Sequence, residues 1–121
     1  MELLNDEIRN DLIITAIEGG SNYWYFLDNE ACDIINQYKD KGMAFSEAIL
    51  PAINDENKIP IHDCETGDLL GYLSKESIEK GEESMYKEFS DHFSNSLNEN
   101  WDAETADVWF QLCVMGELVY G

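Results

Sequence analysis

The sequence predicts an α+β domain in which three to four helices pack on a small antiparallel sheet. Three observations support this class. Long stretches repeat apolar residues at three- and four-residue spacing, which is typical of helices. Two short apolar runs flank the turn-forming residues Glu65-Thr66-Gly67-Asp68, which predicts a β-hairpin. The last helical stretch is apolar nearly all round, so this helix is expected to be central and buried.

The first part of the chain is predicted to form a helix and a strand. The helix runs from Asp6 to Glu18, with Asn5 or Asp6 as its cap and an apolar stripe at helical spacing. Gly19-Gly20 is expected to end it, because glycine adopts the left-handed conformation at little cost. The aromatic run Tyr23–Leu27 is typical of a buried strand.

The middle of the chain is predicted to hold a second helix, a short helical segment and the hairpin. Asp28 caps the helix, which continues to about Tyr38. The segment from Ala44 to Ile53 is also helical, interrupted or started afresh at Pro51. The hairpin spans Lys58 to Tyr72, and Pro60 predicts that its first strand lies at a sheet edge.

The rest of the chain is predicted to form two helices. Ser74 caps a long helix that ends near Asn98-Glu99-Asn100, and Gly81 on its apolar face predicts close packing against another element. Asp102 caps the last helix, from Ala103 to Met115. The chain has 121 residues, 44% of them hydrophobic, so we expect residues 1–121 to form a single domain.

Charge is the strongest compositional signal. Asp and Glu number 26 against 7 Lys and Arg, and the net charge is −19. A field of that sign repels phosphates, which disfavours direct binding of nucleic acid and of anionic membrane surfaces. A basic protein surface fits better as a partner. The alternative interpretation is that the charge only keeps a small protein soluble.

Cysteine usage and the start of the sequence bear on the compartment. The sequence contains three cysteines, Cys32, Cys64 and Cys113. Their number is odd, and their spacing matches no disulfide framework and no paired zinc motif. The opening residues predict no signal peptide, and no stretch is long and apolar enough to predict a transmembrane helix. The sequence therefore predicts a cytoplasmic protein, with its cysteines as small core residues.

Three parts of the chain resemble a known family. The first is the stretch Ala16-Ile17-Glu18-Gly19-Gly20 with the following Tyr23-Trp24, and the last is the ending that runs through 102–108 and 116–121. The middle part comprises Ile61, Asp63, Glu65, Thr66, Leu73, Glu76, Ile78, Gly81 and Met85. In these residues the chain resembles a family of short, uncharacterised phage and prophage proteins. Val114-Met115 departs from the pattern, because family members often carry an aromatic residue there. The resemblance implies a phage or prophage origin, with the host cytoplasm as the compartment, and it implies no reaction.

Residues that could carry catalysis or hold a metal do not form a recognisable motif. His62 and Cys64 make one loose pair without the second pair that structural zinc sites show. Cys113 lies in the most apolar segment, where a thiol stays protonated. The sequence thus indicates no catalytic residue, no metal site and no cofactor, and it favours a non-enzymatic protein.

Two sets of residues are candidates for binding. No Lys or Arg follows Lys87, and the carboxylates beyond it predict an acidic partner-binding surface. We list this set as Glu88, Asp91, Glu99, Asp102, Glu104 and Asp107. A second set would line a cleft, and its members are Trp24, His92, Gln111, Glu117 and Tyr120. For three of these a structural role is the alternative: His92 would hydrogen-bond a neighbouring element, and Gln111 and Glu117 would satisfy backbone groups near Gly19-Gly20.

Three functions follow from these features. The first is a phage-derived acidic binding protein that inhibits a host nucleic-acid-binding or defence protein, an anti-defence role. The second is a small-molecule binder or small enzyme with a cleft near Trp24, His92 and Glu117. The third is a virion assembly or structural protein. Steep salt dependence, a polar-lined pocket and an exposed apolar patch would distinguish them.

Overall fold

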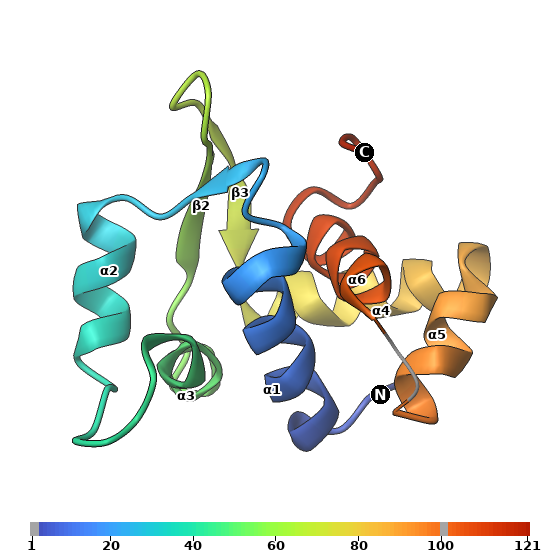
Figure 1. Cartoon of the computed structure of the whole chain (residues 1–121), viewed down its shortest axis with the longest axis horizontal. Coiled ribbons are helices and arrows are strands. Elements are labelled where there is room, and N and C mark those ends of the chain that lie inside the picture. The colour runs from blue at the N-terminus through green and yellow to red at the C-terminus, as the bar shows by residue number, and fades with distance from the viewer. Residues whose placement is uncertain (1–2, 100–101) are drawn as a thin grey trace.

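The computed structural model describes residues 3–99 and 102–121 and confirms the α+β class (Figure 1). Six α-helices and a three-stranded antiparallel sheet lie within these residues. In chain order the elements are α1 (Asp6–Thr15), β1 (Tyr25–Phe26), α2 (Asn29–Asn36), α3 (Ile49–Asn54), β2 (Ile59–Asp63), β3 (Leu69–Leu73), α4 (Lys75–Glu88), α5 (Ser90–Leu97) and α6 (Ala103–Met115). A π-helical turn, η1 (Ala16–Gly20), extends α1, and a 3-10 turn, η2 (Phe45–Ala48), precedes α3.

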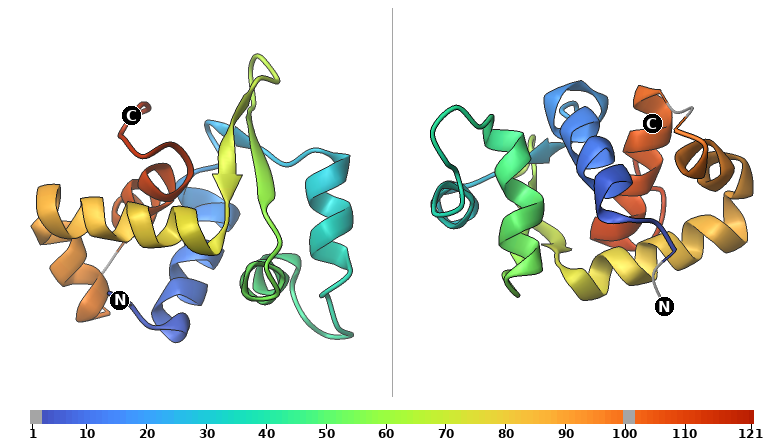
Figure 2. Two further views of the ribbon diagram at one scale, coloured as in Figure 1. Left: turned by 180° about the vertical axis from the view of Figure 1, so that it is seen from behind. Right: turned by 90° about the horizontal axis from the view of Figure 1, so that it is seen from below.

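The helices lie on both sides of the sheet. Figures 1 and 2 show α1 and α6 on one side and α2 and α3 on the other, with α4 running below the hairpin towards α5. Helix α6 packs against α1, η1, α4, α5 and β3, and nearly all its residues from Thr105 to Val114 are buried. The prediction of a central, buried last helix is therefore confirmed. None of the helices in the described ranges is long and apolar enough to cross a bilayer.

The close packing predicted at Gly81 is found between α4 and α6. A Cβ atom placed on Gly81 would lie 2.6 Å from the Cα atom of Cys113, closer than side chains allow. Gly20 has a similar role, because a Cβ there would lie 2.8 Å from the carbonyl oxygen of Ala103. Gly19-Gly20 was expected to end the first helix through a left-handed residue. That expectation is wrong, since neither glycine has a positive φ angle and the helix continues as η1 up to Gly20.

The predicted caps are present. Side chains of Asn5, Asp28, Ser74 and Asp102 each accept a hydrogen bond from a backbone N–H in the first turn of the following helix. The Oγ of Ser77 in turn accepts a hydrogen bond from the backbone N–H of Ser74, which completes a capping box. These interactions involve residues three apart in sequence, so they can be predicted without knowledge of the tertiary fold.

The long helix expected after Ser74 is broken at Phe89. This residue has φ −132° and ψ 52°, and the chain resumes as α5 in a new direction. Phe93 on α5 is buried in the core, whereas Leu97, one turn later, is exposed. The predicted end of the helix falls at 98–100, and its last residue, Asn100, lies outside the described residues.

The sheet has the strand order β1-β2-β3, and two predictions about its strands need correction. Pro60 was expected at a sheet edge, but its strand, β2, is the central one. Proline is tolerated there because β1 pairs only with His62 and Asp63, so Pro60 has a strand on one side alone. The aromatic run 23–27 contributes only Tyr25–Phe26 as a strand, and its buried member is Trp24, just before the strand.

Candidate functional site

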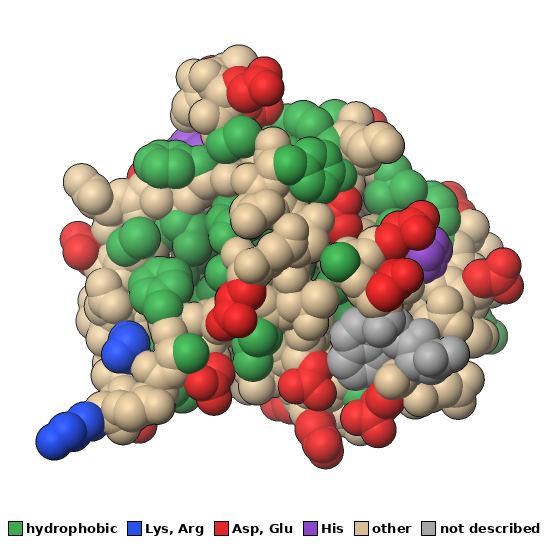
Figure 3. All heavy atoms as spheres, viewed as in Figure 1, with side chains coloured by type: hydrophobic (Ala, Val, Ile, Leu, Met, Phe, Trp, Pro, Cys, Tyr) green, Lys and Arg blue, Asp and Glu red, His purple; other side chains and the backbone are tan. Residues whose placement is uncertain are grey.

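Exposed carboxylates surround α5 and the start of α6. Figure 3 shows Asp and Glu side chains over this right-hand part of the molecule, whereas the Lys and Arg side chains in view lie at the opposite corner. The exposed members of the predicted set are Glu88, Asp91, Glu99, Asp102 and Glu104. Because the chain supplies no Lys or Arg after Lys87, the sequence around α5 offers these carboxylates no cation.

The nearest lysines in sequence are already paired. On α4, Lys87 Nζ lies 2.7 Å from Glu83 Oε1, and Lys80 Nζ lies 3.2 Å from Glu76 Oε1. Such pairs four residues apart on an exposed helix face stabilise the helix by roughly 0.3–0.5 kcal/mol each. Both lysines are thus balanced within α4 itself, and the acidic surface around α5 keeps its charge.

Asp107 does not belong to the acidic surface, which corrects the prediction. It lies on the inner side of α6, and its carboxylate accepts hydrogen bonds from several side chains. The donors are Ser21 Oγ (2.7 Å), Tyr23 OH (2.5 Å), Trp24 Nε1 (2.8 Å) and Gln111 Nε2 (3.1 Å). The charge is therefore used inside the molecule, where it fixes the loop after η1 against α6.

Gln111 holds the C-terminal segment. Its side chain is buried, and its Oε1 accepts hydrogen bonds of 2.9 Å from the backbone N–H groups of Val119 and Tyr120. Its Nε2 donates to the Tyr120 carbonyl at 3.2 Å. Gln111 thus satisfies backbone groups at the C-terminus rather than near Gly19-Gly20. Glu117, for which the same role was considered, is instead exposed after the left-handed residue Gly116.

Tyr120 covers Trp24. The two rings stack with centroids 5.2 Å apart and planes 10° from parallel. The Tyr120 hydroxyl also donates to Asp63 Oδ2 at 2.6 Å, and this bond raises the pKa of Tyr120 to about 12 while it lowers the pKa of Asp63. Partial burial and the Asp107 carboxylate raise the pKa of Tyr23 to about 12 as well. Both phenols therefore stay protonated as donors.

The five predicted cleft residues are not brought together. Trp24, Gln111 and Tyr120 lie in one cluster, but their polar groups are occupied by one another, by Asp107 and by the C-terminal backbone. His92 lies on α5, where its Nδ1 is 2.9 Å from Thr105 Oγ1, and so it joins α5 to the first turn of α6. Within the described residues neither His92 nor Glu117 contacts that cluster through a hydrogen bond or ion pair.

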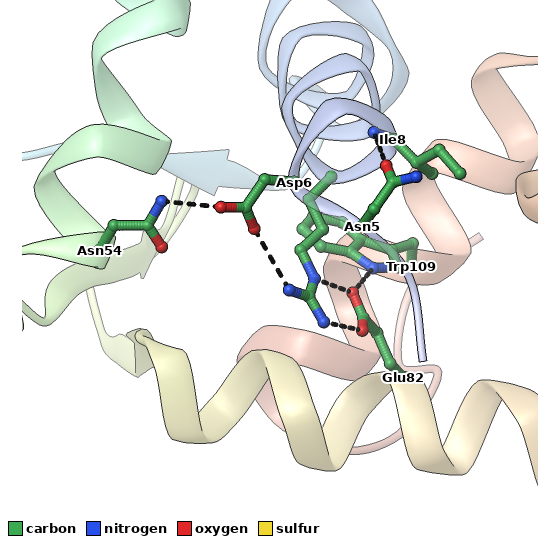
Figure 4. Close-up of polar contacts among 7 residues, drawn as sticks. Asn5, Asp6, Ile8, Asn54, Glu82 and Trp109 are labelled. Carbon is green, nitrogen blue, oxygen red and sulfur yellow. Dashed lines mark hydrogen bonds and ion pairs between the residues drawn. The ribbon is translucent and has the colours of Figure 1, made fainter. Parts of the chain in front are cut away.

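A buried ion pair links α1, α4 and α6 (Figure 4). Arg9 Nε and Nη2 donate to Glu82 Oε2 and Oε1 at 2.9 and 2.7 Å, and Trp109 Nε1 donates to Glu82 Oε2 at 3.1 Å. Glu82 is completely buried. Sequence reasoning did not select this pair. The sequence did indicate that Glu82 is buried, because Glu82 falls on the same helix face as Ile78 and Met85.

A cavity of about 420 Å³ lies beside this ion pair, between α1, α3 and α4. At its rim, Asp6 accepts hydrogen bonds from Arg9 Nη1 (3.3 Å) and from Asn54 Nδ2 (3.2 Å), as Figure 4 shows. Its lining residues are Asp6, Arg9, Leu50, Ile53, Asn54, Lys75, Ile78 and Glu79. It contains none of the predicted cleft residues, and its charged groups are of both signs.

Cysteine and histidine chemistry is limited in the described part of the chain. Burial raises the pKa of the Cys113 thiol well above its ordinary value, with the Glu82 carboxylate as a second cause. His62 Nε2 lies 3.7 Å from Asp28 Oδ2, whereas Cys64 points to the carbonyl of Tyr23 at 3.2 Å. Residues 3–99 and 102–121 hold no group of three or more His, Cys, Asp or Glu side chains that could bind a metal ion.

Comparisons of the chain with models of protein families, with curated proteins and with solved structures find no match.

Proposed function

We propose that this chain is a phage- or prophage-derived acidic binding protein that occupies a basic surface of a host nucleic-acid-binding or defence protein without catalysing a reaction. The observation that supports it is the exposed carboxylate surface of Glu88, Asp91, Glu99, Asp102 and Glu104, in a stretch that holds no cation. The phage or prophage origin in this proposal rests on the sequence resemblance alone.

The physical basis of the proposal is long-range attraction. Carboxylates on a protein of net charge −19 produce a negative potential that extends about 8–10 Å into solution at moderate ionic strength. A surface that binds the DNA backbone carries Lys and Arg side chains spaced to meet phosphates. Carboxylates displayed along a helix present comparable charges to such a surface, so the chain would compete with nucleic acid for it.

Two features of the fold support the availability of this surface. Four of the acids, Glu88, Asp91, Glu99 and Glu104, are exposed and accept no side-chain donor among the described residues. Asp102 is exposed as well, and its Oδ1 accepts a hydrogen bond of 3.1 Å from the N–H of Thr105, which leaves Oδ2 without a donor among the residues that the structure describes. The buried Glu82 and the half-buried Asp107, in contrast, already hold Arg, Trp, Tyr and amide donors.

The test is retention of host proteins at two salt concentrations. The tagged chain is incubated with bacterial host lysate in 0.05 M and in about 0.5 M salt, and retained proteins are identified by mass spectrometry. The proposal predicts a discrete DNA-binding or nuclease protein that is retained at low salt and lost at high salt. Retention of nothing specific in either buffer would contradict it.

A matched pair of variants separates this surface from net charge alone. The first carries Glu88→Gln, Asp91→Asn, Glu99→Gln and Glu104→Gln, and leaves the cap Asp102 intact. The second removes the same charge from exposed acids of α1, of α2 and of the loop after α2, through Glu7→Gln, Glu30→Gln, Asp33→Asn and Asp40→Asn. The proposal predicts that only the first loses the partner. Equal retention by both would place the binding surface elsewhere.

A further inference from the structure

The free edge of β3 is an exposed part of the fold that neither the acidic set nor the cleft set includes. In the strand order β1-β2-β3 this strand has β2 on one side and, among the described residues, no strand on the other. In the left view of Figure 2, β3 is the strand nearest the viewer, and no helix crosses in front of it. Exposed sheet edges usually carry a Lys, a Pro or a bulge that prevents pairing with another chain.

The register shows which backbone groups face that edge. Pro60 lies opposite Tyr72, between the pairs Ile59–Leu73 and Ile61–Gly71. Since proline has no N–H, Pro60 and Tyr72 are the pair that exchanges no hydrogen bonds, and the flanking pairs are the bonded ones. The N–H and C=O of Tyr72 therefore point away from β2. Among the described residues no backbone bond outside the ladder engages either group.

The side chains beside the edge are apolar and uncovered. Directly opposed residues of an antiparallel pair project on the same face, so Leu69 shares a face with His62, and Tyr72 shares it with Pro60. The other face is inside the molecule, where Gly71 meets the carbonyl of Val114. On the face that carries Pro60 and His62, Pro60 is buried, whereas Leu69 is 49% exposed and Tyr72 is 45% exposed. Strand β3, Leu69–Leu73, contains no Lys and no Pro. Its register shift, opposite Ile61 and His62, lies at the hairpin end and leaves Gly71–Leu73 in regular pairing with β2.

Charge limits what can pair with this edge. At its hairpin end, Glu65 and Asp68 are exposed and the turn has no cation. At its other end, Lys58 and Lys75 lie with Glu56 and Glu76 around a small cavity of about 230 Å³. A second copy of the chain would bring together two molecules of net charge −19 each. An extended segment with cationic side chains meets no such repulsion, and its cations are best placed next to the hairpin.

We propose that β3 accepts an extended, basic, partly apolar segment of the partner protein as a fourth strand of the sheet. Main-chain bonds to Tyr72 supply affinity, apolar contacts with Leu69 and Tyr72 set the register, and Lys or Arg side chains meet Glu65 and Asp68. The inference rests on the proposed function, since it names how a basic partner is held at short range. The carboxylates around α5 attract the partner at long range and offer no apolar contact.

The experiment titrates ¹⁵N-labelled chain with a synthetic eight-residue peptide that alternates valine and lysine. A peptide with glutamate in place of lysine, and a lysine peptide N-methylated at alternate residues, serve as controls. The proposal predicts shift changes centred on Leu69–Leu73 and at least tenfold slower hydrogen exchange of the Tyr72 amide with the lysine peptide alone. Shift changes centred on α5, dimerisation through β3, or no binding at millimolar peptide would each overturn it.

Variants of Tyr72 test the edge directly. Tyr72→Pro removes an N–H that makes no ladder bond, and it should weaken peptide binding at least tenfold. Tyr72→Lys keeps the backbone and should weaken it by a similar factor, so the test survives if the proline variant misfolds. Tyr86→Lys is the matched control, because Tyr86 is 56% exposed but lies on α4. Equal binding by Tyr72→Lys and Tyr86→Lys would overturn the inference.

The two proposals fail in different ways. If the wild-type chain retains a host protein in a salt-sensitive manner and Tyr72→Lys retains it equally well, strand addition is wrong and the acidic-surface function stands. If the lysine peptide binds at β3 but the lysate yields no salt-sensitive partner, the edge is a binding site and the proposed function is wrong.

Discussion

Carboxylates in two regions of this molecule have the same chemistry and opposite surroundings. Glu82, which is buried, and Asp107, which is half-buried, are each met by several donors, from Arg9 and Trp109 in one case and from hydroxyl, indole and amide groups in the other. Around α5 the acids face water and have no cation nearby in sequence. The comparison teaches that position decides whether one of the 26 acids stabilises the fold or remains available to a partner.

Among the engaged carboxylates, the largest loss of stability is expected when Glu82 loses its partner Arg9. Arg9→Met should lower the free energy of unfolding by about 3–5 kcal/mol, because it leaves the Glu82 charge buried without its cation. Urea denaturation measures the loss. The double variant Arg9→Met/Glu82→Leu should be more stable than Arg9→Met, because it removes the second charge too. A double variant less stable than the single one would contradict this account of the pair.

Asp107→Asn gives the next largest effect. The amide keeps one acceptor oxygen but loses the charge and the second acceptor, so two or more of the four donors lose their partner. We expect a loss of about 2 kcal/mol in unfolding free energy. Glu104→Gln, one helical turn earlier and exposed, is the control and should cost less than about 0.5 kcal/mol. Equal losses would mean that Asp107 is no more engaged than a surface acid.

Alkaline pH should weaken the hydrogen bonds of Tyr23 and Tyr120, with a smaller effect on stability than the Arg9 and Asp107 substitutions. Tyr23 and Tyr120 have pKa values raised to about 12 in the folded chain, from an ordinary value of 10.0. Above pH 10 the unfolded chain loses these protons first, so stability is fully present below pH 10 and falls as the pH rises towards 12. Thermal unfolding across this range should show a shallower fall for Tyr23→Phe and Tyr120→Phe. A fall as steep as that of the wild type would refute the assignment.

The surface side of the comparison should show the smallest effect on stability. Neutralising Glu88, Asp91, Glu99 and Glu104 together should change the unfolding free energy by less than about 1 kcal/mol. Asp91 and Glu104 lose favourable positions in a first helical turn, whereas reduced repulsion among the remaining acids offsets that loss. A loss as large as that of Asp107→Asn would show that these acids stabilise the fold.

Local interactions could be predicted from the sequence, and long-range ones could not. The caps at Asn5, Asp28, Ser74 and Asp102 and the turn at 65–68 depend on residues that are neighbours in the chain. The break at Phe89 depends on where α5 packs, and the central position of β2 depends on a strand of only two residues. Neither has a sequence signal comparable to a cap.

The same distinction explains the outcome for the candidate residues. The exposure of Glu88, Asp91 and Glu104 follows from their polar positions near the ends of α4, α5 and α6. The hydrogen bonds of Asp107 could not be predicted, because most of its donors, among them Ser21 and Trp24, lie more than eighty residues away in the chain. Helical periodicity placed Glu82 on an apolar face, but nothing in the sequence identified Arg9 as its partner.

The most direct test of the central claim measures the affinity for the retained basic protein as a function of salt. Wild-type chain, the variant neutralised around α5 and the variant with the same charge removed elsewhere are compared. The account predicts at least tenfold weaker binding and a shallower dependence of log Kd on log salt for the α5 variant alone. Equal losses in both variants would show that net charge, and not this surface, determines binding, and would contradict the account.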